Sequence, residues 1–117
     1  MWLEILCPPF PAGATVEISR VCAAPGVRLD VGDPLFDLQV DLTAGEWMDC
    51  PAVSTVRITM REPVWLRDIL VRPGQTVEEH APLARLSVDP DEIEGAPARP
   101  ARINVATIVD QSDWWAA

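Results

Sequence analysis

The sequence predicts an all-β fold made of two similar halves, and three features indicate it. Twelve Pro and six Gly are spread along the 117 residues, so no window of helical length lacks a helix breaker until the last third of the chain. Residues with branched β-carbons cluster in short runs, and several runs alternate apolar and polar side chains. The third feature is an internal repeat with a constant spacing of 48 residues.

Eight runs are expected to form strands. In chain order they lie at 2–6, 15–22, 34–40, 46–49, 55–60, 65–71, 82–88 and 103–109. In the second run Val16 and Ile18 are two positions apart, so both side chains point to one face of the strand. Pro34 and Pro82 are expected only at the first position of their strands, because proline has no N–H to give to a sheet ladder.

The repeat aligns residues 20–41 with residues 68–89 without gaps. Seven pairs are identical: Pro25/Pro73, Gly26/Gly74, Pro34/Pro82, Leu35/Leu83, Leu38/Leu86, Val40/Val88 and Asp41/Asp89. The Pro-Gly pairs are typical of type II turns, in which Gly takes a positive φ. The four Leu are expected to face the core. Two copies are too few for a solenoid, so the repeat predicts a fold with pseudo-twofold symmetry.

The chain divides into a domain at 1–89, a linker at 90–101 and a final segment at 102–117. The linker sequence is acidic and then rich in Ala and Pro, with little to bury, so it is expected to be extended. Its carboxylates lack the spacing of a calcium loop. The final segment holds a strand-like run and then Trp114 and Trp115.

The formal net charge of −9 argues against nucleic-acid binding, because an acidic surface repels phosphate groups. There is no apolar stretch of about 18 residues and no signal-like start, so we expect a cytoplasmic protein without membrane attachment. All nine basic residues are Arg, and Lys does not occur in the sequence.

Cysteine and histidine supply few candidates for chemistry. Cys7, Cys22 and Cys50 are an odd set with no C-x-x-C spacing, so they are expected to be small apolar residues in a reducing compartment. His80, the only histidine, is expected in an exposed turn. A metal site formed by the three cysteines and His80 is the alternative.

Residues 1–89 resemble the biotinyl/lipoyl carrier domain. The stretches that carry the resemblance are "MWLEILCP", "PGVRLDVGDPLFDLQVD", "AGEWMDCPAV" and "ILVRPGQTVEEHAPLARLSV". The resemblance implies a barrel-sandwich hybrid of two four-stranded sheets with pseudo-twofold symmetry. Membrane-fusion adaptors of efflux pumps also contain such a domain, but a long helical hairpin separates its halves there, and this chain has only about ten extra residues between them.

The sequence departs from the family pattern at three places. Leu42 occupies the position of the Lys that carries the cofactor, and no other Lys is present to replace it. Residues 51–74 are longer than the usual connection, so 53–62 is expected to lengthen a hairpin. His80 stands where the repeat has Gly32, which leaves the shape of that bend open. The chain is therefore expected to carry no covalent cofactor.

Adjacent Trp114 and Trp115 cannot both face one core if they lie in a strand, because consecutive side chains point to opposite faces. Either the run at 103–109 adds an edge strand and the Trp pair closes an open end of the barrel, or the pair docks on a protein partner. With Leu42 they are the candidate protein contacts.

These features predict a non-enzymatic lipoyl-like protein that acts as an accessory, assembly or interaction subunit of a larger protein complex. No catalytic, cofactor-binding or metal-binding residue is expected. A module of the same fold that binds a small ligand or a metal is the alternative.

Overall fold

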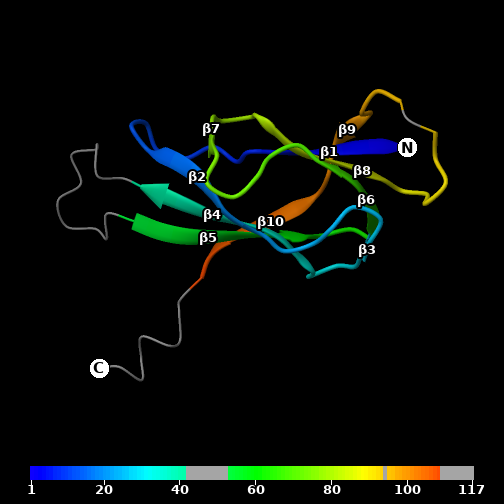
Figure 1. Cartoon of the computed structure of the whole chain (residues 1–117), viewed down its shortest axis with the longest axis horizontal. Coiled ribbons are helices and arrows are strands. Elements are labelled where there is room, and N and C mark those ends of the chain that lie inside the picture. Colours follow the sequence, from blue (N-terminus) through cyan, green and yellow to red (C-terminus); the bar gives the residue numbers. More distant parts are fainter. Residues whose placement is uncertain (42–52, 94, 109–117) are drawn as a thin grey trace, which may run out of the picture.

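The computed structural model describes residues 1–41, 53–93 and 95–108, and every regular element in these ranges is a strand. Two five-stranded sheets form the molecule (Figure 1). The first sheet has the order β3 (Arg28–Leu29), β6 (Val64–Ile69), β8 (Pro82–Ser87), β1 (Trp2–Leu6) and β9 (Arg99–Pro100). The second has the order β10 (Ile103–Thr107), β5 (Val53–Met60), β4 (Pro34–Asp41), β2 (Thr15–Val21) and β7 (Thr76–Val77). The all-β prediction is confirmed.

Alternating side chains of the long strands bury an apolar core. Leu35, Leu38, Leu83 and Leu86, which the repeat placed inside, are each 0% exposed. Val16 and Ile18 are also buried on one face of β2. Burial of this kind contributes roughly 25 cal/mol for each Å² of apolar surface removed from water, so the inner faces of the strands provide the main stabilising term.

The 48-residue repeat extends to the backbone hydrogen bonds of the turns. The Gly26 N–H donates to Leu66 O at 2.7 Å, and the Gly74 N–H donates to Ile18 O at 2.8 Å. Leu66 and Ile18 are themselves 48 residues apart. Each turn therefore bonds to a strand of the other half of the chain.

Strand pairing follows the same spacing. The short strand β3 pairs with β6, placing Arg28 opposite Trp65, and its counterpart β7 pairs with β2, placing Thr76 opposite Glu17. The register shifts in β2 and β6 also correspond, since one begins after Ile18 and the other after Leu66. The sequence analysis missed β3 and β7, because two-residue strands carry no periodicity.

The bends that precede β4 and β8 adopt the left-handed conformation at matching positions. Gly32 has φ 92°, and His80, its counterpart in the second half, has φ 64°. The Gly32 N–H donates to Met60 O at 2.7 Å, and the His80 N–H donates to Cys7 O at 2.9 Å. His80 thus keeps the bend of the repeat, although a side chain with a β-carbon is strained there.

The prediction of two four-stranded sheets is wrong in the number of strands. The segment after Asp89 adds β9 to the edge of β1 and β10 to the edge of β5, so each sheet has five strands. Residues 53–60, expected to lengthen a hairpin, form β5, the partner of β4 along its length. The strand predicted at 46–49 lies outside the described residues. In the described ranges there is also no helix able to span a membrane.

Replacing His80 with Gly is expected to stabilise the fold by about 0.5 to 1 kcal/mol, because relief of about 1–2 kcal/mol of left-handed strain exceeds the entropic cost of Gly. Gly32→Ala is the matched control and is expected to destabilise by about 1 kcal/mol. No atom lies within 4 Å of the β-carbon that this change adds, so only strain is introduced. Urea unfolding measures both changes, and a loss of stability in His80→Gly would show that the side chain at this bend is stabilising.

Candidate functional site

One end of the second sheet brings together the described residues that flank the predicted protein contacts. β4 ends at Asp41, which is paired with Val53 at the start of β5. β10 runs toward the same end, where the Ile108 N–H donates to Thr55 O at 2.9 Å. We call this region, formed by Asp41, Val53, Thr55 and Ile108, the hairpin end (Figure 1).

Leu42, Trp114 and Trp115 themselves lie outside the described residues. Leu42 directly follows Asp41, and the Trp pair follows Ile108 after five residues. Because β4, β5 and β10 are neighbours in one sheet, the described residues on both sides of 42–52 and the last described residue, Ile108, lie at the hairpin end. Leu42 and the Trp pair are more than 70 residues apart in the sequence, so the sequence did not indicate that the strands before them end on the same side of one sheet.

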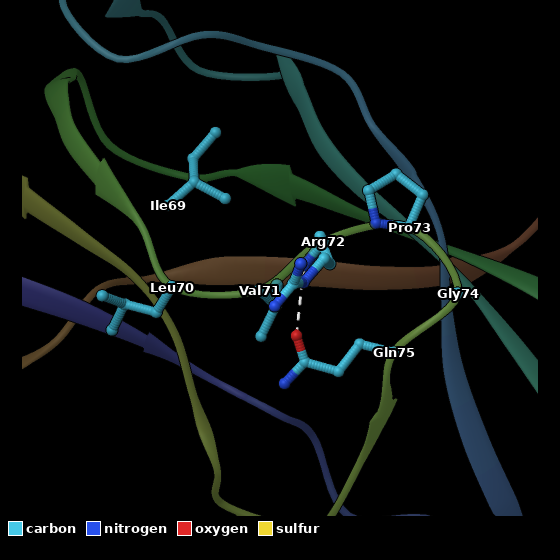
Figure 2. A pocket seen from close by; sticks show the side chains of 7 residues that line it. All are labelled: Ile69, Leu70, Val71, Arg72, Pro73, Gly74 and Gln75. Carbon is cyan, nitrogen blue, oxygen red and sulfur yellow. Dashed lines mark hydrogen bonds between the residues drawn. The ribbon is translucent and has the colours of Figure 1, made fainter.

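Two of the pockets in the described part of the chain involve residues of the second half. The first, about 730 Å³, is lined by consecutive residues 69–75 around the Pro73–Gly74 turn (Figure 2). Within the turn, the Arg72 N–H donates to Gln75 Oε1 at 3.2 Å. The concave side of a single turn does not bring together side chains from different elements, so its geometry gives no support for catalysis.

The second pocket, about 340 Å³, lies between the loop before β2 and the stretch around β7. The Phe10 ring and the carboxylates Glu78 and Glu79 contribute to its lining. This arrangement joins an apolar surface to two negative charges and contains no nucleophile paired with a base.

The cysteines and His80 do not form the alternative metal site in the described part of the chain. Cys7 is buried, and desolvation followed by the charge of Glu79 raises the pKa of its thiol. Burial, followed by the charge of Asp37 on the neighbouring strand β4, raises the pKa of the Cys22 thiol. The side chain of His80 is 69% exposed, with Nε2 3.9 Å from Glu79 Oε1. Among the described residues no three His, Cys, Asp or Glu side chains are placed to hold a metal, and Cys50 lies outside them.

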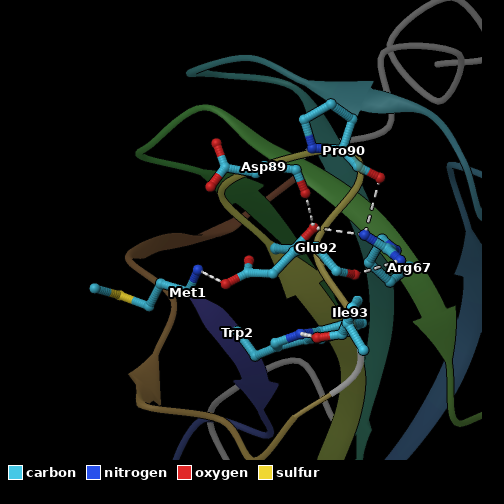
Figure 3. Close-up of polar contacts among 8 residues, drawn as sticks. Met1, Trp2, Arg67, Asp89, Pro90, Glu92 and Ile93 are labelled. Carbon is cyan, nitrogen blue, oxygen red and sulfur yellow. Dashed lines mark hydrogen bonds and ion pairs between the residues drawn. The ribbon is translucent and has the colours of Figure 1, made fainter.

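The segment expected to be a linker is bound to the first sheet through Trp2. We call residues 89–93 and 95–108 the crossing segment, because it passes from one sheet to the other. Trp2 is 6% exposed, and its Nε1–H donates to Ile93 O at 2.6 Å (Figure 3). The guanidinium carbons of Arg67 and Arg85 lie 4.8 and 5.1 Å from its ring centroid. Such cation–π contacts stabilise by about 0.5–2 kcal/mol each.

Arg67 also binds the backbone of the crossing segment directly. Its Nη1–H donates to Pro90 O at 3.0 Å and its Nη2–H donates to Glu92 O at 2.9 Å (Figure 3). Arg85 donates similarly to Gly95 O at 2.7 Å. The two guanidinium groups satisfy carbonyl groups that an Ala- and Pro-rich chain cannot pair within itself. Trp2 and Glu4 are two positions apart in β1, so they lie on one face of the strand. Nothing in the sequence indicated what covers this face.

A second anchor holds the crossing segment where it changes sheets. Arg99 donates from Nη1 and Nη2 to the two carboxylate oxygens of Glu62, at 2.8 and 2.7 Å. The Arg102 N–H donates to Glu62 Oε2 at 2.7 Å. The hydrogen bonds from Arg99, supported by those from Arg102, lower the pKa of Glu62 to about 2. Glu62 lies in the β5–β6 connection, so it links that turn to the start of β10.

Comparisons with protein-family models, with curated proteins and with solved structures each found no match to this chain. Function is therefore inferred from the fold and from the residues described above.

Glu62→Gln is expected to destabilise the protein by about 1 to 2 kcal/mol at pH 7, after discounting for the solvent around Arg99. The folded-state pKa of about 2 lies below the ordinary value of 4.5. The stabilisation is therefore complete above pH 4.5 and is lost as the pH falls toward 2. Urea unfolding of both proteins should show their difference shrinking across this interval.

Glu78→Gln is the matched control, because it makes the same substitution at an exposed carboxylate. It should leave stability within about 0.5 kcal/mol of the unmodified protein. A difference for Glu62→Gln that persists unchanged at pH 2 would contradict the role assigned to its charge.

Proposed function

We propose that this chain is a barrel-sandwich hybrid of the lipoyl type that carries no covalent cofactor and acts as an accessory or assembly subunit of a larger protein complex. The hydrogen bonds and strand pairs at a 48-residue spacing support the pseudo-twofold symmetry of this fold. Each core sheet then has four strands, β7-β2-β4-β5 and β3-β6-β8-β1, and the crossing segment adds the fifth.

The convergence of two chain segments at the hairpin end is the single observation that carries the interaction role. In the carrier domains that residues 1–89 resemble, the Lys at the tip between the halves carries the cofactor. Here Leu42 takes that position in the sequence, and β10, which precedes Trp114 and Trp115 in the chain, runs toward the same end of the sheet. An apolar residue and two Trp make a contact surface of the kind that dominates protein–protein binding energies.

The same geometry argues against catalysis as the primary role. The two pockets described above lack a nucleophile–base pair. The groups whose pKa is clearly shifted belong to ion pairs, such as Glu62, or are thiols desolvated by burial, such as Cys7. Glu62 and Asp37 are each held by an Arg, which is typical of structural carboxylates.

Purification of the tagged full-length chain from its native host is expected to recover a stoichiometric protein partner. A chain ending at Ile108 and the variant Leu42→Asp should each lose it, because each removes part of the apolar contact surface. Ending the chain at Ile108 preserves β9 and β10, so the unfolding midpoint should change little. Mass photometry and peptide identification measure the recovery.

Val31→Asp is the matched control for Leu42→Asp. Val31 is 64% exposed and lies in the bend at the other end of β4, so this variant adds the same charge away from the hairpin end. It is expected to keep the partner. Repeated recovery of the chain without a partner, or a partner retained by both altered forms, would refute the proposed role.

A further inference from the structure

The four edge strands of the two sheets differ in how well they are protected against pairing with another chain. β3, β7 and β9 have two residues each, and β9 includes Pro100, which has no N–H. β10 has five residues, with the sequence INVAT. Proteins usually protect edge strands by shortening them or by placing charge or Pro in them, and β10 has none of these features.

The free hydrogen-bonding groups of β10 can be assigned from its pairing with β5. The Arg61 N–H donates to Arg102 O and the Ile108 N–H donates to Thr55 O, both at 2.9 Å. Backbone groups alternate in direction along an antiparallel pair, so residues 102, 104, 106 and 108 bond to β5. Ile103, Val105 and Thr107 therefore direct N–H and C=O away from β5, to the side where the described chain places no further strand.

The side chains of β10 continue the core-facing surface of the second sheet. Val105 lies opposite Ile58 and Ile103 lies opposite Met60, and both of these β5 residues are fully buried. Ile103 is partly buried against the core, but Val105 is 43% exposed. The apolar face of this sheet thus extends one strand beyond the surface that covers it.

We propose that β10 pairs with β10 of a second copy of this chain, antiparallel and centred on Val105. This register places Val105 opposite its own counterpart and Ile103 opposite Thr107, so the outward-facing groups of both strands bond to one another. The two exposed Val105 side chains then cover each other. The second sheets of the two copies become one continuous sheet.

The composition of β10 favours a second copy as the occupant. The chain carries a net charge of −9, which opposes self-association over most of its surface. Residues 103–107 are uncharged, so antiparallel self-pairing sets no like charges against each other. A single register pairs the outward N–H and C=O groups of β10 in both copies. The contact is then isologous and twofold, the type most frequent among homo-oligomers. This inference goes beyond the proposed partner binding and is independent of it.

Sedimentation equilibrium of the purified full chain is expected to give twice the mass of 12.8 kDa. Val105→Pro and Val105→Arg should each weaken self-association at least tenfold. Val105→Pro removes the N–H at the centre of the proposed strand pair, and Val105→Arg places two like charges opposite each other there. Neither removes a β10–β5 hydrogen bond, so the circular dichroism spectrum should be retained. Asn104→Arg is the matched control, because residue 104 lies opposite Ala106 in this register, and it should remain dimeric.

Amide hydrogen exchange of the unaltered chain tests the register without a mutation. At concentrations that favour the dimer, the amides of Ile103, Val105 and Thr107 should gain protection, whereas those of Asn104 and Ala106 are protected at every concentration. A chain that is monomeric at its highest soluble concentration overturns the proposal. A dimer that both Val105 variants preserve, or one in which these three amides stay unprotected, overturns it equally.

Discussion

The two Pro-Gly turns each donate a hydrogen bond to a strand in the other half of the chain, from Gly26 to Leu66 and from Gly74 to Ile18. The short strands that follow these turns are edge strands of the opposite half's sheet. Neither half can therefore complete a sheet alone, and the apolar side chains of both are buried only when the two are together. The positive φ of each Gly is required for this exchange, because a residue with a β-carbon in its place is strained.

With β3 and β7 each at one edge of the opposite half's sheet, β1 and β5 form the other edges. The crossing segment pairs with both of them, through β9 and β10. A sequence of Ala, Pro and acidic residues has little apolar surface to bury, so its order must come from polar contacts. Arg67 and Arg85 bind its carbonyl groups, and Glu62 binds Arg99 and the Arg102 N–H. The all-Arg basic composition suits this role, because a guanidinium can bond to several acceptors in a plane while it stacks on Trp2.

The sequence was sufficient to predict those features of the fold that are repeated or periodic. Identical residues at a 48-residue spacing located the turns, the strand starts at Pro34 and Pro82, and the buried Leu35 and Leu83. Two kinds of feature were not predictable from it. Strands of two residues have no period, and the position of the crossing segment depends on contacts between Trp2, Arg67 and residues far along the chain. At the candidate site, the residue types of Leu42, Trp114 and Trp115 were apparent from the sequence. That the strands preceding them, β4 and β10, end on the same side of one sheet became apparent only from the pairing of both strands with β5.

The two proposed interfaces use different parts of the chain. Self-pairing would engage its outer edge around Val105, whereas the partner surface begins beyond Ile108, where β10 reaches the hairpin end. Antiparallel strands run in opposite directions, so the hairpin ends of two paired copies would lie at opposite ends of the joined sheet. Such a dimer would present two equivalent contact surfaces facing away from each other. An assembly subunit with this geometry would link two partner molecules, and the avidity of the pair would depend on the span between the two ends.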